Sequence, residues 1–382
     1  MSRSKHVPAL DGARGMAVLL VMLVHLGGGA QSRFLPIRLI GIGIKTGWTG
    51  VMLFFVLSGF LITGILWDSK GQEHWWRNFY MRRVLRIFPL YYWTLLIVLG
   101  GAAAVGMLRT CLSQIWVFGL YLQNVPWLLQ TAQTLASPVP MGHFWSLAVE
   151  EQFYLVWPFL LLWTKTLRQA KTLCLSVFLL SGLFRVVVWT LHPDSFGNIQ
   201  FLPTHAGELA MGGYLAVSLR DGSWRYLERW ATLAMVMSLS GFVASCYVSH
   251  DLRGISQGAM FYGLPCLTIF YAGLLVQAMG TGVWNRLTSM RWLRWVGSIS
   301  YGLYVYHVVL IPIYPWIVER IVPHAGRNAT LMLDGITGFA VSFLVAWLSF
   351  RFFETPFLNL KRRYKEEETS AAPMERLADE AV

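Results

Sequence analysis

Long apolar stretches recur along the whole of this 382-residue chain, with short polar segments between them. About 20 consecutive apolar residues are enough for a helix to cross the hydrocarbon core of a bilayer. In lipid a helix satisfies its own backbone hydrogen bonds, which an irregular segment does not. We therefore predict an all-α polytopic membrane protein with about ten transmembrane helices, at residues 12–30, 48–67, 85–106, 144–163, 172–191, 204–219, 230–249, 255–279, 295–318 and 329–353.

The composition agrees with a membrane protein. Hydrophobic residues make up 55% of the chain and charged residues only 13%, against about 25% charged residues in a typical soluble domain. The net charge of +12 is scattered between the apolar stretches. We therefore expect the basic residues to interact with the lipid bilayer, and we exclude nucleic acid as a binding partner. The segment 107–142 is interrupted by Pro and Gln, and we expect a long outer loop there.

The distribution of basic residues predicts the orientation, because Lys and Arg concentrate in cytoplasmic loops. With the N-terminus placed in the cytoplasm, 23 Lys and Arg fall in inner segments, 7 in outer segments and Arg185 within a span. We thus expect a multi-pass protein of the bacterial inner (plasma) membrane with both termini cytoplasmic. Residues 1–357 would form one membrane domain, and residues 358–382 a short, charged, disordered cytoplasmic tail.

Cysteine usage gives no sign of a metal site. The chain has four cysteines, none of them in a CxxC pair, and most fall inside apolar stretches. We expect no metal. The sequence leaves the oligomeric state unknown.

Arg14 and His25 bracket the first apolar stretch. Ionisable residues inside a membrane span are costly and usually functional. The two side chains would lie roughly 16 Å apart along the helix axis, with the cation at the cytoplasmic face and the imidazole near the midplane or beyond. The imidazole could act as a general base or carry an acyl group itself. A neighbouring carboxylate would fix its tautomer.

Further ionisable residues are sorted by depth. Arg83 and Arg86 share one helical face at the cytoplasmic start of the third span, where they and Arg14 could grip a phosphorylated donor. A positive-inside anchoring role for these arginines stays open, as does a structural role for each histidine. The remaining candidates lie in the middle and outer half of the membrane: Glu150, Glu151, Glu208 and His307.

Six motifs, in order, resemble those of the bacterial membrane acyltransferase family 3. The first is Leu10–Gly15 together with His25 in an Arg-x10-His spacing. The other five are Gly50–Thr63, Arg82–Pro89, His143–Tyr154, Ser300–His307 and Phe353–Pro356. Each motif alone is modest support, but the set spans residues 10–357.

The resemblance implies an inner-membrane O-acyltransferase. Such an enzyme would move an acetyl or other short acyl group from cytoplasmic acyl-CoA to a hydroxyl of a carbohydrate. The acceptor would be exopolysaccharide, O-antigen or a similar glycan, with a macrolide or other small glycosylated molecule as the alternative. We expect the form without a C-terminal SGNH domain, which disfavours the O-antigen and peptidoglycan subgroups that need that second domain.

The resemblance and the depth sorting together give the candidate site. The catalytic candidates are His25 and Glu150. The candidates for binding acyl-CoA are Arg14, Arg83 and Arg86. The candidates for binding the rest of the substrate are Trp145, Glu151, Glu208 and His307. Roles for Glu150 and Trp145 are the least settled by the resemblance.

A transporter or flippase for a lipid-linked sugar or organic anion is the alternative function. Intramembrane His and Glu residues also form proton relays. Paired broken helices in inverted repeats would mark such a protein, and the sequence shows no clear pair. A non-catalytic assembly partner explains the buried charges poorly.

Overall fold

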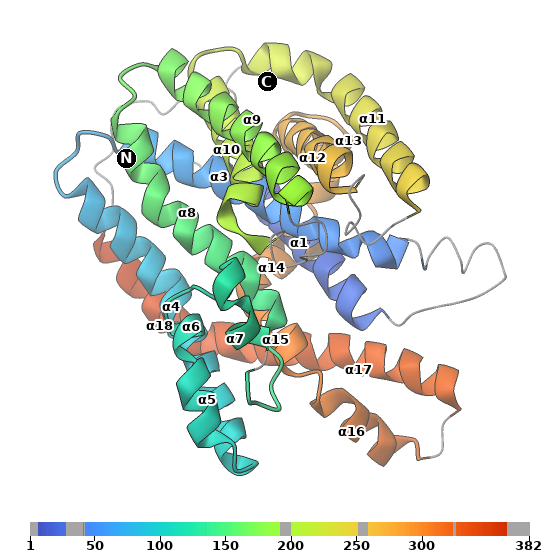
Figure 1. Ribbon diagram of the computed structural model, residues 1–382. Helices are drawn as coiled ribbons and strands as arrows, with labels where there is room; N and C mark the ends of the chain where they lie inside the picture. The colour runs from blue at the N-terminus through green and yellow to red at the C-terminus, as the bar shows by residue number, and fades with distance from the viewer. Residues whose placement is uncertain are drawn as a thin grey trace.

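The computed structural model describes residues 7–27, 41, 43–133, 135–191, 200–250, 259–323 and 326–364. Regular structure within these ranges is helical, without a strand, so the predicted all-α class is confirmed (Figure 1). The longer helices are α1 (Pro8–Leu26), α3 (Gly50–Asp68), α4 (Trp75–Ala104), α8 (Trp145–Leu162), α9 (Leu167–Leu191), α10 (Leu202–Arg220), α11 (Trp224–Ser249), α12 (Leu264–Met279), α15 (Ser300–Val309), α16 (Ile313–Ile321) and α17 (Arg327–Leu348).

Seven described helices are long and apolar enough to cross a membrane, or eight if the bent pair α15–α16 counts as one span. The expected spans 144–163 and 204–219 are helices as well, α8 and α10, but they are not among those seven. All ten expected segments thus contain helix in their described parts. The number of crossings and the orientation of the termini stay predictions.

Close contacts between backbones hold α1 and α3 in the middle of the bundle. A Cβ atom on Gly12 of α1 would overlap the carbonyl oxygen of Thr288, at the end of α13 (Val283–Thr288). A Cβ atom on Gly59 of α3 would overlap the carbonyl oxygen of Leu209 in α10. Small residues at such positions are the usual way for membrane helices to pack closely.

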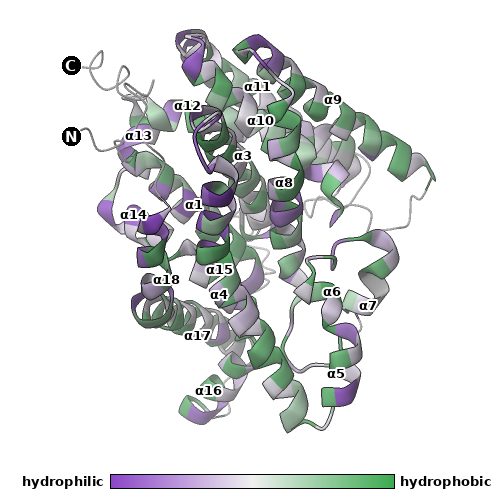
Figure 2. Ribbon diagram, turned by 90° about the vertical axis from the view of Figure 1, so that its left-hand side faces the viewer, coloured by the Kyte–Doolittle hydropathy of each residue, from purple (hydrophilic) through white to green (hydrophobic). Residues whose placement is uncertain are grey.

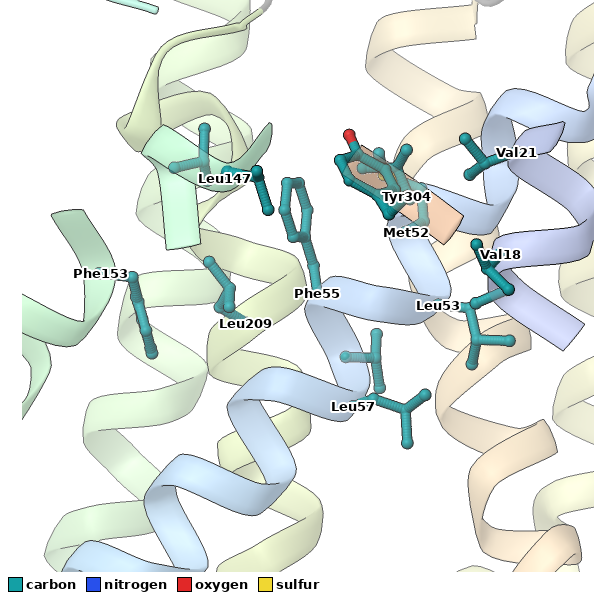
Figure 3. Packing of buried hydrophobic residues seen from close by; sticks show 14 of the residues in the cluster. Val18, Val21, Met52, Leu53, Phe55, Leu57, Leu147, Phe153, Leu209 and Tyr304 are labelled. Atoms are coloured by element: carbon teal, nitrogen blue, oxygen red, sulfur yellow. The ribbon is translucent and has the colours of Figure 1, made fainter. Parts of the chain in front are cut away.

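The apolar core lies around α3. In Figure 3, α3 runs between Val18 and Val21 of α1 on one side and Leu147 and Leu209 of α8 and α10 on the other. Phe55 of α3 is only 1% exposed. Large apolar side chains elsewhere face outward, for example Leu179 of α9 and Met237 of α11. The hydrophobic colour on the long helices in Figure 2 fits a lipid-facing surface.

The expected span 295–318 is not one continuous helix. It is divided into α14 (Arg291–Ser298), α15 and α16, with a bend of 73° between the last two. Pro312 lies at this bend and has no backbone N–H to continue the helix. The Tyr314 hydroxyl of α16 donates to the carbonyl oxygen of His307 at 3.0 Å, which satisfies a group at the end of α15.

The segment 107–142 is irregular, as expected for a loop. It contains three short helices: α5 (Leu108–Gln114), α6 (Trp116–Gly119) and α7 (Leu129–Gln133). Some of its apolar side chains are buried, such as Val117 and Phe118, whereas Trp127 is 76% exposed. Aromatic side chains of this kind are common at membrane–water interfaces.

The predicted tail is helical where it is described. After α17, a π-helical turn, η6 (Ser349–Glu354), leads into α18 (Thr355–Leu360) and the 3₁₀ turn η7 (Lys361–Arg363). The rest of the tail, beyond residue 364, lies outside the described residues. Both α18 and η7 pack against α4.

Candidate active site

Five helices line a partly open cavity in the middle of the bundle. Helix α1 contributes Arg14, helix α3 contributes Ser58, and α4 contributes Arg83 and Arg86. The remaining polar wall comes from α8 and α15: Ser146, Glu150, Glu151, Tyr154, Ser300, Tyr301 and Tyr304. The structure thus brings the three predicted donor-binding arginines together with two of the three predicted carboxylates, Glu150 and Glu151.

The arginines reach the cavity from two helices. Arg14 of α1 donates to Asp11 at 3.3 Å and keeps 22% of its side chain exposed. The Arg83 guanidinium lies 5.7 Å from the centre of the Tyr154 ring. Its Nε atom is buried and has no protein hydrogen-bond partner. A buried donor of this kind calls for an acceptor from water or a ligand.

The two carboxylates of α8 differ in their surroundings. Glu150 accepts hydrogen bonds from the hydroxyls of Ser58 at 2.7 Å and Tyr154 at 3.1 Å. One carboxylate oxygen of Glu151 is buried without a protein partner. Glu150 is therefore held in place, while Glu151 and Arg83 retain polar atoms that a bound molecule could satisfy.

His25 lies outside this cavity. It occupies the last turn of α1, where its side chain is exposed. Its Nδ1 atom is 2.9 Å from the carbonyl oxygen of Val21 and 3.3 Å from Nε2 of His307. The two imidazole rings meet edge to face with centres 5.0 Å apart. His307 is fully buried.

A thin layer of side chains separates the cavity from the two histidines. Tyr304 lines the cavity on one side, and its ring centre lies 5.7 Å from that of His307 on the other. Its hydroxyl donates to the carbonyl oxygen of His143 at 2.8 Å and accepts from Ser146. Figure 3 shows Tyr304 with its hydroxyl at the far end of the ring. Tyr304 and His307 thus stand between the arginine cavity and His25.

His143 is a residue of this layer that the sequence analysis did not single out. Its ring lies 5.2 Å from His307 and is almost fully buried. Its Nε2 atom is 3.2 Å from the carbonyl oxygen of Val305. The available signal was its position at the start of the motif His143–Tyr154, next to the apolar stretch of α8.

Trp145 and Glu208 belong to a second polar cluster that does not line the cavity. Glu208 of α10 forms an ion pair with Arg185 of α9 at 2.9 Å, and both side chains are buried. The Trp145 ring lies 5.2 Å from the ring of His205, also on α10. Arg185 and His205 keep buried nitrogen atoms without protein partners. The sequence analysis left Arg185 within a span and named no partner for it. In the structure its partner is Glu208.

The described part of the chain contains no group of three or more His, Cys, Asp or Glu side chains arranged to hold a metal ion. All four cysteines are free thiols. Three of them are buried, in keeping with small core residues.

Comparison with known proteins gives relatives along nearly the whole chain. A peptidoglycan O-acetyltransferase, OatA, of Listeria monocytogenes is 29% identical over 95% of this chain and 58% of its own length. A putative peptidoglycan O-acetyltransferase, YrhL, of Bacillus subtilis is 27% identical over 92% of this chain and 55% of its own. An O-acetyltransferase, OatA, of Staphylococcus aureus is 26% identical over 93% of this chain and 58% of its own length.

This chain therefore spans somewhat more than half the length of these relatives. No solved structure matches it. The family model described as an acyltransferase domain matches residues 7–351, which include every motif of the resemblance except the last. The chain belongs to this acyltransferase domain family.

Proposed function

We propose that this protein is a membrane O-acyltransferase that moves an acetyl or other short acyl group from acyl-CoA to a hydroxyl of a glycan. The observation that carries the proposal is the cavity with three converging arginines, which a chain of two side chains, Tyr304 and His307, connects to His25. Membership of the acyltransferase domain family supports the reaction type. The names of two relatives, OatA of Listeria monocytogenes and YrhL of Bacillus subtilis, support a glycan acceptor.

The donor half of the proposal rests on charge and shape. Coenzyme A carries several phosphate charges, and arginine binds phosphate through two parallel hydrogen bonds. Arg14, Arg83 and Arg86 offer such donors from two walls of one cavity. The predicted topology would open this end to the cytoplasm, where acyl-CoA is made. A thioester held there would extend its acyl end towards Tyr304 and His25.

The chemical step needs a group that can take a proton or the acyl group. In the first route His25 takes the proton of the acceptor hydroxyl while that oxygen attacks the thioester carbonyl and the C–S bond breaks. In the second route a nitrogen of His25 attacks the thioester carbonyl and the C–S bond breaks. The acceptor oxygen then displaces the imidazole, and the freed imidazole nitrogen takes the hydroxyl proton. Both routes release the CoA thiolate. In this proposal Glu150, on the donor side, exchanges a proton with that thiolate.

The acceptor half is proposed from the exposed position of His25. An exposed imidazole can meet a hydroxyl that arrives from outside the bundle. Peptidoglycan is the first glycan to test, because it stands in the names of two relatives. Exopolysaccharide, O-antigen and glycosylated macrolides are the next acceptors in such a test.

The experiment measures release of CoA from acetyl-CoA by the purified protein in lipid nanodiscs, with and without glycan fragments. We expect release that depends on the acceptor, and acetyl esters on the acceptor by mass spectrometry. His25→Ala should abolish both, and His250→Ala, an exposed histidine at the end of α11, should change neither. Uptake of a lipid-linked sugar or organic anion without CoA release would support the transporter alternative and overturn the proposal.

A further inference from the structure

The ring of His307 is fixed in one protonation pattern by its own helix. Its Nδ1 atom lies 2.7 Å from the carbonyl oxygen of Tyr304 and 3.0 Å from that of Leu303. A carbonyl oxygen only accepts hydrogen bonds, so the Nδ1 atom of His307 carries the hydrogen. In a neutral imidazole the other nitrogen, Nε2, is then an acceptor.

The same argument carries over to His25. Its Nδ1 atom faces two acceptors, the carbonyl oxygen of Val21 at 2.9 Å and Nε2 of His307 at 3.3 Å. Since neither neighbour has a hydrogen to give, Nδ1 of His25 must be the donor to both. The Nε2 atom of His25 is left with its lone pair, on a side chain that is exposed.

We propose that His307 is a positioning residue, which together with the backbone carbonyl of Val21 holds His25 in the tautomer whose Nε2 atom is free to take a proton or an acyl group. The effect of His307 on acyl transfer rests on the proposed function, whereas the contact between His307 and His25 does not. It differs from the sequence expectation, which gave His307 a substrate-binding role and looked for a carboxylate beside His25. In a Ser-His-Asp triad a carboxylate accepts the Nδ1–H hydrogen bond, and here a neutral imidazole accepts it.

This arrangement also stabilises the charge that develops during the reaction. When Nε2 of His25 accepts a proton or an acyl group, the ring becomes positively charged. A hydrogen bond from a charged donor is shorter and about twice as strong as a neutral one. The bond from Nδ1 of His25 to His307 therefore strengthens in the charged intermediate, while no buried negative charge has to be maintained beside it.

Both partners are held by the surrounding helices. The Tyr314 hydroxyl donates to the backbone oxygen of His307 and lies 2.8 Å from the hydroxyl of Ser342 in α17. The rings of His143 and Tyr304 pack against the His307 ring. At the end of α1, a Cβ atom on Gly335 of α17 would meet the carbonyl oxygen of Leu26. The glycine lets α17 support the turn that carries His25.

The test measures the nucleophilicity of His25 directly, without the transfer reaction. Diethyl pyrocarbonate acylates unprotonated imidazole nitrogens, and mass spectrometry reports the rate at each histidine. The informative variants are His307→Gln, whose amide oxygen can reach the place of Nε2, and His307→Asn, which is too short to do so. The exposed residues His74 and His250 give the reference rate in every sample.

We expect His25 in the wild type and in His307→Gln to react at similar rates. In His307→Asn it should react about fivefold more slowly, the factor that one hydrogen bond is worth. Equal rates in all three proteins would overturn the positioning role. Both variants keep a polar amide at position 307. A loss of fold in either one would raise the reaction rate of buried His143, which distinguishes it from a change at His25 alone.

The same variants separate this inference from the proposed function. If both hold, His307→Asn lowers kcat for acyl transfer and leaves KM for acyl-CoA unchanged, because the arginine cavity is intact, and His307→Gln restores kcat. If the expected acylation pattern appears but the wild type transfers no acyl group, the positioning stands and the function falls. If transfer occurs with equal kcat in all three proteins, the positioning falls and the function stands.

Discussion

At the scale of single residues, the site depends on ionisable side chains that meet across different helices. Arg14, Arg83 and Arg86 were expected at one site, and the structure brings them to one cavity. The pairing of His25 with His307 joins residues 282 positions apart. Helical periodicity says which side chains share a face of one helix, but not which face of a distant helix lies opposite.

The arginines give the first prediction at this scale. Each hydrogen bond from a guanidinium to phosphate is worth about 1.5–3 kcal/mol, so Arg83→Met or Arg86→Met should weaken CoA binding by roughly 10- to 100-fold. Isothermal titration calorimetry of CoA with the purified protein measures this. Arg77→Met, an exposed arginine near the start of the same helix, is the matched control and should bind CoA normally. Unchanged affinity in the cavity variants would remove the donor-site assignment.

Lys361 gives the second residue-scale prediction. It lies in η7, just beyond the last apolar helix, and burial together with the nearby Arg86 and Arg83 lowers its pKa to about 7. The free amine is therefore largely neutral above that pH. A bound polyanion favours the charged form and raises the pKa, so CoA should bind with proton uptake, and its affinity should fall as pH rises above about 7.

Calorimetry in buffers of different ionisation enthalpy measures that proton uptake. Lys361→Met should abolish the uptake and flatten the dependence of affinity on pH. Lys165→Met, an exposed lysine after α8, should leave both as in the wild type. Proton uptake that persists in Lys361→Met would assign the titrating group elsewhere.

At the scale of helices, the presence of a helix was easier to predict than a break within it. Every expected span contains helix in its described part, because apolar length alone predicts a helix. The division of 295–318 into three helices was not predicted. Its break depends on Pro312 and on the Tyr314 hydroxyl, which satisfies the freed carbonyl oxygen of His307. A hydropathy pattern does not distinguish such a break from a continuous helix.

The pairing of α9 with α10 gives a stability prediction. Arg185 and Glu208 are a buried ion pair, and removing one partner of such a pair costs about 3–5 kcal/mol because the other charge stays buried. Glu208→Gln should therefore destabilise the protein strongly. The double variant Arg185→Met with Glu208→Leu should recover most of the loss. Denaturant unfolding in detergent measures this, and wild-type stability of Glu208→Gln would contradict the pairing.

The contact between α3 and α10 gives a stability prediction for two matched glycine variants. Gly59→Ala places a Cβ atom against the backbone of Leu209, so the helices must separate, at a cost of roughly 1–3 kcal/mol for overpacking. Gly100→Ala on α4 meets open space and should be neutral or slightly stabilising. Equal unfolding midpoints for the two variants would mean that α3 and α10 are not in backbone contact.

At the scale of the whole molecule, the arrangement follows from closing a polar cavity inside an apolar bundle. Helices α1 and α3 lie in the middle, with α9 and α11 on one side and α16 and α17 on the other (Figures 1 and 2). The positive-inside pattern predicts which end of this bundle faces the cytoplasm. Membrane helices were thus predictable from composition, whereas the cavity required the contacts among five helices.

The predicted orientation can be tested on vesicles of known sidedness. A cysteine introduced at Glu73, between α3 and α4, should react with an impermeant maleimide only from the cytoplasmic face. One introduced at Trp127 should react only from the opposite face. The four native cysteines, three of them buried, are replaced first. The reverse pattern would place the arginine end of the cavity away from acyl-CoA and contradict the proposed direction of transfer.

The most direct test of the central claim, that acyl groups pass from the arginine cavity to His25 and on to a glycan, is mass spectrometry of cell-surface glycans. Cells that make the wild-type protein, the His25→Ala variant or no protein are compared, with the variant present in the membrane at the wild-type level. The account predicts acyl esters on one glycan only in the wild-type cells. Esters of equal abundance in the His25→Ala cells would contradict it.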